Sequence, residues 1–348
     1  MRIAVTGSIA TDHLMHFPGR FSDQLLPDEL DHVSLSFLVD DLQVRRGGVA
    51  ANIAFGLGCL SLRPVLVGAV GRDFEAYGAW LHRHGVDTRS VHVSRTRHTA
   101  RFLCTTDGDG NQIASFYAGA MSEAATISLG TVAERVGGLD LVLIGANAPE
   151  AMLRHTQDCR TAGLPFAADP SQQLARLRGE KIQDLVAGAD LLFTNEYESA
   201  LLLRKTGWTP VDVLARVGTW VTTLGDKGCL VQRRGEPPIE IAAVPVAEPV
   251  DPTGVGDGFR AGFLAAIAWG LTPTRAAQLG CAVAANVLRA VGPQEHRLSG
   301  DELLSQCGSA YGPDAAADFG GHLPRELTAS DHDPCIRGAK TARTGLGE

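Results

Sequence analysis

Two aspartates and three glycines open the apolar helical stretch DPTGVGDGFRAGFLAAIAWG at residues 251–270. The first amides of a helix have no internal carbonyl partner and lie at the positive end of the helix dipole. Small residues such as Gly254 and Gly256 let an anion approach these amides closely. A carboxylate among them, Asp257, is poorly placed if the site merely holds an anion. It fits a general base that takes a proton while the amides stabilise charge arriving nearby.

A second glycine pair, Gly47-Gly48, precedes another helical run. A double glycine lets the backbone approach a ligand closely. Asn52, about one turn into that helix, can both donate to and accept from a pair of hydroxyl groups. Because glycine pairs are also common at ordinary helix starts, this pattern alone leaves a binding role and a structural role equally open.

Asn195 and Glu198 stand three residues apart where a predicted strand gives way to a helix. Asn195 alone fits an N-cap, which is the commoner role. Together the two side chains also offer oxygen ligands to a hydrated magnesium ion. The segment TTLGDKGCLV at 222–231 reads on its own only as two strands joined by a glycine-bounded turn.

Apolar runs alternate with helical patterns along most of the chain, which predicts an α/β fold with a mostly parallel sheet and helices on both faces. Ligand sites in such sheets lie beyond the carboxyl ends of the strands. The predicted strands are 3–6, 65–70, 139–144, 166–168, 191–194 and 221–224. The predicted helices are 50–60, 74–84, 149–162, 182–187, 197–205, 211–217, 254–269 and 274–291.

Two segments interrupt this alternation, at about 13–45 and 88–118. The first carries the strand-like run SLSFLVDDLQV, and the second has a DGDGN turn between apolar and aromatic strands, which is a good hairpin signal. Together they predict a small antiparallel sheet inserted at the N-terminal side of the main body. A small sheet over a cleft is a candidate lid; the alternative is a peripheral hairpin with no role.

Bulk properties exclude several classes of protein. The net charge is −8 without a long basic run, so we expect no nucleic acid polymer and no membrane as partner. Seven scattered cysteines without a CxxC motif indicate reduced thiols, and the N-terminus reads as a strand rather than a signal peptide. We therefore expect a cytoplasmic protein. Neither GxxxxGK[ST] nor GxGxxG is present, which disfavours a P-loop enzyme and a dehydrogenase. Residues 1–325 read as one domain, and 326–348 as a disordered tail.

The order of the motifs is more informative than any one of them. Gly47-Gly48 with Asn52, then NEYE, TTLGDKG and DPTGVGD, resembles the PfkB family of carbohydrate and nucleoside kinases over roughly residues 1–320. More narrowly, VTGSIATDHLM, SLSFLVDDL, ASFYAGAMSEA and AADPSQQLARL resemble the bacterial adenosine kinases of mycobacteria and relatives. The resemblance implies a ribokinase-like three-layer α/β/α fold with a β-sheet lid.

The resemblance also assigns residues to the phosphate side. Asp257 would be the general base, and the amides of Gly254, Val255 and Gly256 would form the anion hole. Val255 stands where the family usually has a smaller residue. Asn195 and Glu198 would organise Mg2+ and the phosphates, largely through water. Thr223, Gly225 and Gly228 would lie along ATP.

The acceptor side is assigned in the same way. Asp12 would accept hydrogen bonds from the ribose hydroxyls, because a carboxylate suits a vicinal diol. Phe102 and Phe116 would sandwich a purine, although without the resemblance ordinary packing within the lid is the favoured interpretation. The remaining substrate-binding residues implied are Ser8, Ser36, Gly48, Asn52, Gln172, Gln173 and Arg176.

The function implied is that of an adenosine kinase, which transfers phosphate from ATP to the 5′-hydroxyl of adenosine and yields AMP for purine salvage. The alternatives are a sugar kinase of the same family, of the ribokinase or fructokinase type, and a non-catalytic nucleotide-binding regulator. The resemblance further implies activation by K+ in addition to Mg2+. A homodimer that pairs lid with lid would cover the exposed sheet edges.

Overall fold

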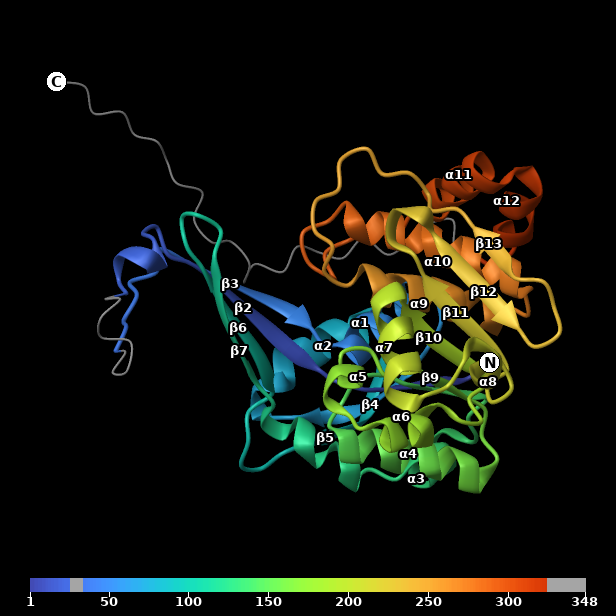
Figure 1. Cartoon of the computed structure of the whole chain (residues 1–348), viewed down its shortest axis with the longest axis horizontal. Coiled ribbons are helices and arrows are strands. Elements are labelled where there is room, and N and C mark those ends of the chain that lie inside the picture. Colours follow the sequence, from blue (N-terminus) through green and yellow to red (C-terminus); the bar gives the residue numbers. More distant parts are fainter. Residues whose placement is uncertain (26–33, 324–348) are drawn as a thin grey trace.

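The parallel sheet predicted from the sequence forms the centre of the molecule in a computed structural model that describes residues 1–25 and 34–323. Its nine strands run in the order β13-β12-β11-β10-β9-β8-β1-β4-β5, and the seven from β11 to β5 are parallel (Figure 1). The strands are β1 (Ile3–Thr6), β4 (Val65–Val70), β5 (Asp87–Val93), β8 (Leu141–Ile144), β9 (Phe166–Ala168), β10 (Leu191–Asn195), β11 (Thr219–Thr223), β12 (Cys229–Arg233) and β13 (Ile239–Ile241).

Helices cover both faces of this sheet, and each layer buries its own apolar cluster against the strands. One layer comprises α1 (Val49–Cys59), α2 (Glu75–Arg83), α9 (Val255–Ala268), α10 (Pro273–Leu288), α11 (Gly300–Tyr311) and α12 (Pro313–Gly320). The other comprises α3 (Leu129–Val136), α4 (Pro149–Ala162), α5 (Gln173–Arg176), α6 (Gly179–Val186), α7 (Glu196–Thr206) and α8 (Pro210–Leu214). The result is a three-layer α/β/α body.

The lid is a separate sheet that projects from one end of the body (Figure 1). Its strands, in the order β3-β2-β6-β7, are β2 (Ala10–His16), β3 (Asp41–Gly47), β6 (Ala100–Thr106) and β7 (Gln112–Tyr117). The expectation of an antiparallel lid is wrong in one respect, because β2 and β6 pair in parallel. The DGDGN turn joins β6 to β7 as an antiparallel hairpin, as predicted.

The lid segments differ from their expected bounds. Residues 87–93 form β5 and extend the large sheet beside β4, so the lid part of the second segment begins only at Ala100. The polar alternation of DTRSVHV is typical of a half-exposed edge strand, which is why the sequence pattern did not separate it from the lid. Residues 26–33, inside the first segment, and the expected tail at 326–348 lie outside the described residues.

The tip of the lid has a small core of its own. The rings of Phe17, Phe21 and Phe37 contact one another with centroids 4.9–5.8 Å apart. The carboxylate of Asp107, the first residue of the turn, is buried and accepts hydrogen bonds from the amides of Phe21 at 3.0 Å and Asn111 at 2.8 Å. These contacts hold the hairpin and the chain after β2 as one unit.

Most predicted elements are confirmed, three strands and one helix with identical bounds and the others with shifted ends. The helix expected over 211–217 begins at Pro210 and ends at Leu214. No helix within residues 1–25 and 34–323 is long and apolar enough to cross a membrane.

Candidate active site

Polar side chains follow the carboxyl ends of five neighbouring parallel strands. Because β4 and β8 flank β1 on opposite sides, the strand order reverses at β1, and ligand sites in sheets of this kind lie beyond such a point. The glycine motif that begins α9 and the helix that follows Gly48 both point their N-termini at this edge. The residues at the strand ends are Ser8, Asn147, Asp169, Asn195 and Thr223.

The two glycine motifs, 205 residues apart in sequence, meet at Asp257. The Asn52 side-chain amide donates to Oδ2 of Asp257 at 2.8 Å. Gly254 precedes α9 with a φ of 77°, and a side chain there would overlap Pro293. Only glycine fits both constraints without strain, so Gly254 sets the start of α9 and places Asp257 in its first turn.

Burial raises the pKa of Asp257 to about 7, with smaller contributions from the nearby carboxylates of Asp169 and Glu198. The hydrogen bond from Asn52 and the positive charge of Arg260 act in the opposite direction. A carboxylate with a pKa near neutrality is well matched to general-base catalysis, because it is ionised at pH 7–8 and still holds a proton well.

The raised pKa predicts a steep acidic limb in the pH profile. The base must be ionised to act, so kcat/KM should fall about tenfold for each pH unit below the pKa of Asp257 near 7. Asp12, whose pKa burial raises to about 6, should steepen the same limb if its carboxylate binds the acceptor. Steady-state rates between pH 5.5 and 9 measure this, and a profile flat down to pH 5.5 would contradict it.

A buried ion pair lies one turn beyond the base. The guanidinium of Arg260 donates to both carboxylate oxygens of Asp169, from Nε at 2.6 Å and from NH2 at 2.8 Å. Its third nitrogen donates to the carbonyl of Gly256 at 3.1 Å. The charge and hydrogen bonds of Asp169 raise the pKa of Arg260 despite its burial, so the guanidinium stays charged. The pair ties the start of α9 to the end of β9.

The expected anion hole is partly engaged. The Val255 amide donates to the Pro252 carbonyl at 3.3 Å, closing a turn before α9. The amides of Gly256 and Asp257 lie in the first turn of a 14-residue helix, where the helix itself offers them no carbonyl. Gly256 is exposed at the surface of the site. The helix start therefore still offers donors to an incoming anion.

Ser8 and Gly48 shape the backbone on the acceptor side. Gly48 has a φ of 97°, and a side chain there would clash with the backbone of Ser8 and Ala10. The Ser8 hydroxyl accepts from the Val49 amide at 3.1 Å, and so caps α1 rather than facing an open cavity. Asp12 lies beside them on β2, and the proximity of Asp251 adds to the rise in its pKa.

A row of side chains runs across the lid on the face that carries Asp12. The strand registers pair Arg45 with Asp12, Asp12 with Phe102, and Phe102 with Phe116. Register partners lie on the same face, about 4.8 Å apart from one strand to the next. The two rings therefore lie side by side, and the expectation that they enclose a base from opposite sides is wrong for this structure.

Arg45 joins this lid face to the body. Its NH1 donates to the carbonyl of Val291 at 2.6 Å, beyond the end of α10. The positive charge of Arg45 opposes the rise in the pKa of Asp12 that burial causes, and it adds to the hydrogen bonds that lower the pKa of Asp251. Arg45 therefore stands between the lid carboxylate and the loop that leads into α9.

Three of the predicted acceptor residues are exposed. Ser36 lies in the extended segment before β3, Arg176 ends α5, and the Gln172 side chain accepts from the Ser171 hydroxyl at 2.7 Å. Gln173, in contrast, is buried and donates from Nε2 to the Asn147 carbonyl at 2.8 Å. Its Oε1 has no hydrogen-bond partner among the described residues.

The NxxE motif forms a capping box at the start of α7. The Asn195 side chain accepts from the Glu198 amide, and the Glu198 carboxylate accepts from the Asn195 amide, both at 2.8 Å. This is the capping role considered from the sequence. Burial and the charge of Asp169 raise the pKa of Glu198. With one carboxylate oxygen engaged in the cap, Glu198 fits an ion through bridging water better than direct coordination.

The predicted ATP turn lies next to this cap. Thr223 pairs with Asn195 across β11 and β10, which brings the two motifs to the same edge. Gly225 and Gly228 have φ values of 63° and 99° and flank a short 3-10 turn, η5 (Gly225–Lys227), that leads into β12. Within the described residues, no group of three or more His, Cys, Asp or Glu side chains is arranged to hold a metal ion.

Some residues of the site were not predicted from the sequence. Arg260 carries a readable signal, because a single charge within an apolar helix needs a buried partner. Asp169, its partner, precedes a proline and carries no signal of its own in the sequence. Tyr77 and Gln294, which hydrogen bond to each other at 2.5 Å and to the site, sit in segments without any motif.

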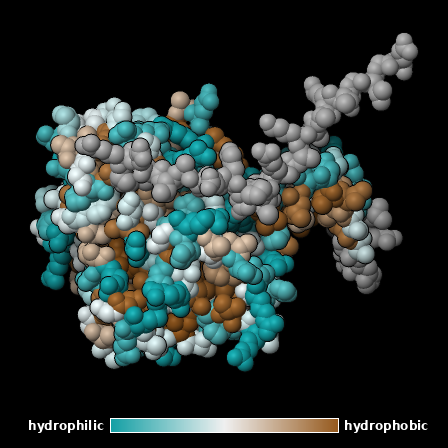
Figure 2. Space-filling model, turned by 180° about the vertical axis from the view of Figure 1, so that it is seen from behind, coloured by the Kyte–Doolittle hydropathy of each residue, from teal (hydrophilic) through white to brown (hydrophobic). Residues whose placement is uncertain are grey.

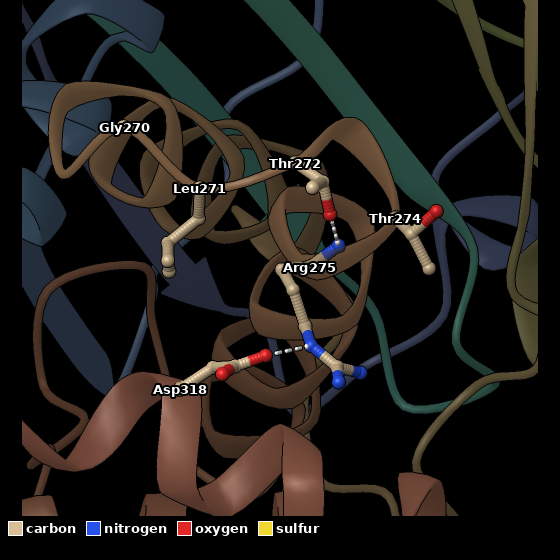
Figure 3. A pocket seen from close by; sticks show the side chains of 6 residues that line it. All are labelled: Gly270, Leu271, Thr272, Thr274, Arg275 and Asp318. Atoms are coloured by element: carbon tan, nitrogen blue, oxygen red, sulfur yellow. Dashed lines mark hydrogen bonds and ion pairs between the residues drawn. The ribbon is translucent and has the colours of Figure 1, made fainter.

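A hollow of about 470 Å³ lies at the opposite end of α9, away from Asp257 (Figure 3). Asp257 lies in the first turn of α9 and Gly270 follows the end of the helix, a separation of about 20 Å along the helix axis. The charged side chain in the hollow, Arg275, is paired with Asp318 at 2.6 Å. The residues that line it are Gly270, Leu271, Thr272, Thr274, Arg275 and Asp318.

Comparison with known proteins points to one group of enzymes. The sequence pattern of the family described as pfkB family carbohydrate kinase matches residues 9–299. The nucleoside kinase of Methanothermobacter thermautotrophicus is 29% identical over 316 residues, which cover 89% of this chain and 96% of that protein. The ribokinase of Bacillus subtilis is 28% identical over 230 residues, covering 64% of this chain and 74% of that protein.

A solved structure resembles this chain in both fold and sequence. The nucleoside kinase of Burkholderia thailandensis in complex with inosine superposes with a TM-score of 0.79 at 31% sequence identity. The match covers 89% of this chain and 97% of that one.

Proposed function

Because this chain belongs to the pfkB family of carbohydrate kinases and has the ribokinase-like fold, we propose that it is a nucleoside kinase. The reaction is transfer of the γ-phosphoryl group of ATP to the 5′-hydroxyl of a purine riboside, with adenosine as the preferred acceptor and AMP as the product. The similarity to nucleoside kinases over 89% of the chain supports the acceptor class.

The observation that carries the proposal is the lid row of Asp12, Phe102 and Phe116. A carboxylate accepts hydrogen bonds from a vicinal diol, and aromatic faces one and two strands away, at about 5 and 10 Å, suit a base attached to the same sugar. A free sugar would bind the carboxylate but would contact neither ring. Binding of a base explains why the half-exposed residue 116 is a phenylalanine rather than a polar residue.

Gln173 is assigned to the acceptor site by the resemblance, where an amide can match both the donor and the acceptor on adenine. In the structure its Nε2 donates to the Asn147 carbonyl, and its buried Oε1 has no hydrogen-bond partner among the described residues. The preference for adenosine among the purines therefore rests on the resemblance, and the acceptor panel tests it.

The chemistry assigned to Asp257 is the removal of the proton from the acceptor 5′-hydroxyl. The hydroxyl oxygen forms a bond to the γ-phosphorus while the bond between that phosphorus and the β,γ-bridging oxygen breaks, and ADP leaves with the electron pair. The proton ends on Asp257. The amides at the start of α9, together with Arg260 behind them, offset the negative charge that passes through the site.

Metal ions enter this proposal in two ways. Mg2+ accompanies ATP as part of the substrate, and Asn195 and Glu198 would hold its water shell rather than the ion itself. K+ activation is proposed from the resemblance alone. Equal rates in potassium and in a bulky organic cation would dismiss it.

An acceptor panel tests the function. ADP release is measured with adenosine, guanosine, inosine, ribose and fructose, at saturating ATP. We expect the highest kcat/KM for adenosine. Phe116→Ala and Phe102→Ala should raise the KM for adenosine by roughly 5- to 150-fold, corresponding to about 1–3 kcal/mol of stacking per base, and leave the KM for ATP unchanged.

Each other outcome favours a different function. Higher kcat/KM for ribose or fructose would establish the sugar kinase, the class of the Bacillus subtilis relative. Tight adenosine binding without turnover would favour a non-catalytic regulator. The presence of Asp257 and its hydrogen bond from Asn52 argue against this function. An unchanged adenosine KM in both phenylalanine variants would remove the lid from base recognition.

We also propose that the chain forms a homodimer through the lid. The lid face opposite Asp12 carries four apolar side chains that are each about half exposed, and apolar residues are visible on the projecting lid (Figure 2). The outer strands β3 and β7 leave unpaired edges, which a second copy would cover. The four residues are Leu42, Val44, Ile113 and Tyr117.

Sedimentation velocity checks the dimer. The chain should sediment as a dimer at micromolar concentration, and Val44→Asp should shift it to a monomer because a charge would be buried at the contact. Val211→Asp, which places the same charge on an exposed valine of α8 far from the lid, should leave the dimer intact. A monomeric parent chain would refute the proposal.

A further inference from the structure

Asn52 must be held in one orientation to serve the base. Its side-chain nitrogen donates to Asp257 at 2.8 Å, and its side-chain oxygen faces away from that carboxylate. Rotating the amide by 180° would place oxygen against oxygen. An ionised carboxylate accepts but cannot donate, so the rotated amide would favour the protonated form of Asp257.

Gln294 supplies the partner that fixes this orientation. Its Nε2 donates to the Asn52 side-chain oxygen at 2.9 Å, so the Asn52 nitrogen is left for Asp257. Gln294 follows α10 and is 1% exposed, which leaves little room for water to substitute. It is also adjacent to Pro293, the residue that packs against Gly254. One short segment therefore supports both the helix start and the base.

The orientation of Gln294 is itself determined by Trp80. The indole nitrogen of Trp80 donates to Oε1 of Gln294 at 3.2 Å. An indole N–H can only donate, so the glutamine oxygen must face it and the glutamine nitrogen must face Asn52. Trp80 is held in place by stacking on Phe55, with ring centroids 5.9 Å apart, and by the guanidinium of Arg46 at 4.2 Å from its ring.

Tyr77 completes the network and links it to the glycine pair. Its hydroxyl accepts from Gln294 Nε2 at 2.5 Å and donates to the Gly47 carbonyl at 2.9 Å. Every hydrogen bond from Trp80 to Asp257 then has a single consistent direction. Such a chain is sensitive to the loss of any one donor, because a partly satisfied buried network is costly.

We propose that Gln294 is a positioning residue, which fixes the Asn52 amide and thereby aims the free oxygen of Asp257 at the acceptor hydroxyl. This inference deepens the proposed kinase function and rests on it. Gln294 does not touch the reacting atoms; its effect passes through Asn52. The charged groups that face Asp257 are Arg260, Asp169 and Glu198, and those near Tyr77 are Arg46 and Asp12.

Gln294→Glu tests the inference with almost no change in shape. The ionised carboxylate can still accept from Trp80 but cannot donate to Asn52, and its negative charge also raises the pKa of Asp257 directly. The Asn52 amide should turn to donate to the new carboxylate and present its oxygen to Asp257. The acidic limb of kcat/KM should move up by about one pH unit or more, a loss of about tenfold at pH 7, and recover toward the parent value at pH 9.

Gln278→Glu is the matched control. Gln278 is another buried glutamine, on α10, and its Oε1 accepts from Arg275 at 2.8 Å without contact to Asn52. Its pH profile should match the parent enzyme. A merely structural role for Gln294 predicts a lower unfolding temperature with an unshifted limb and no recovery at pH 9, and this result would overturn the inference. Gln294→Met adds no charge and so separates the loss of the donor from the Coulombic effect of the new carboxylate. A smaller upward shift is expected from it, and an unshifted limb in folded Gln294→Met would also overturn the inference.

A second measurement keeps this inference separate from the proposed function. The pKa of Asp257 is followed without any substrate by NMR of carboxyl-labelled aspartate, assigned with Asp257→Asn. An upward shift in both Gln294→Glu and the uncharged Gln294→Met supports the positioning role even if no nucleoside is turned over. An unshifted pKa in folded Gln294→Met rejects it, whatever acceptor the enzyme uses.

Discussion

Replacing Asp257 with asparagine is expected to lower kcat by about 10²–10⁴-fold, with a modest change in the KM for either substrate. Asparagine keeps the shape and can still accept the hydrogen bond from Asn52, but it cannot take the proton from the acceptor hydroxyl. The amides at the start of α9 remain, so binding and charge stabilisation continue to supply a residual rate. Initial rates at saturating ATP and acceptor measure the loss.

Stability provides the control for this variant. The pKa of Asp257 is raised in the folded chain, so the folded state holds the proton more tightly than the unfolded state does. Ionisation at higher pH therefore lowers stability, and a neutral asparagine should keep or increase the unfolding temperature at pH 8. A folded variant that retained near-full activity would rule out Asp257 as the base.

Arg260→Met is expected to have the second large effect, destabilising the fold by about 3–5 kcal/mol. Arg260 and Asp169 have side chains only 6% and 1% exposed, so removing the guanidinium leaves a carboxylate buried without its partner. The loss of positive charge beside Asp257 should also move the acidic limb of activity to higher pH, because Arg260 lowers the pKa of that base. Urea denaturation and the pH profile measure the two effects.

Two comparisons make this prediction specific. The same substitution at Arg275, whose pair with Asp318 is partly exposed, should cost about 0–1 kcal/mol (Figure 3). A double variant, Arg260→Met with Asp169→Leu, should recover much of the stability lost in the single variant, because no unpaired charge remains. A single variant as stable as the parent chain would mean that the buried pair does not hold α9 to the sheet.

The glycine motifs at the carboxyl edge of the large sheet could be predicted because each needs a backbone conformation or a close contact that only glycine allows. Gly48 and Gly254 adopt positive φ and touch other segments closely, so their residue type is restricted and readable. Asn52 and Asp257 were assigned to a hydroxyl and to a base from their places beside those glycines, and the structure joins them directly. Which acceptor they serve is a matter for the acceptor panel.

The supporting residues could not be predicted in the same way. Gln294 lies 242 residues from Asn52 in sequence, and a single glutamine after a helix carries no periodic signal. The predicted bounds of the lid were wrong for a related reason. Alternation of polar and apolar residues predicts a strand but not the sheet to which it belongs, and β5 belongs to the large sheet. The register that places Phe102 beside Phe116 depends on how β6 and β7 pair, and the pattern of residues along the sequence does not determine this pairing.

The connections of the lid have a mechanical consequence. Two of its strands enter the body through the chain around Ser8 and through Gly47-Gly48, and Gly47 is itself tied to the Tyr77 hydroxyl. The pivot on this side of the lid and the backbone proposed to bind the acceptor are therefore the same few residues. On that side of the lid, no hinge lies apart from these residues, so the hinge cannot be made more rigid without affecting them. Substitutions that stiffen the pivot should change acceptor release and domain closure together, and selection for one property will carry the other with it.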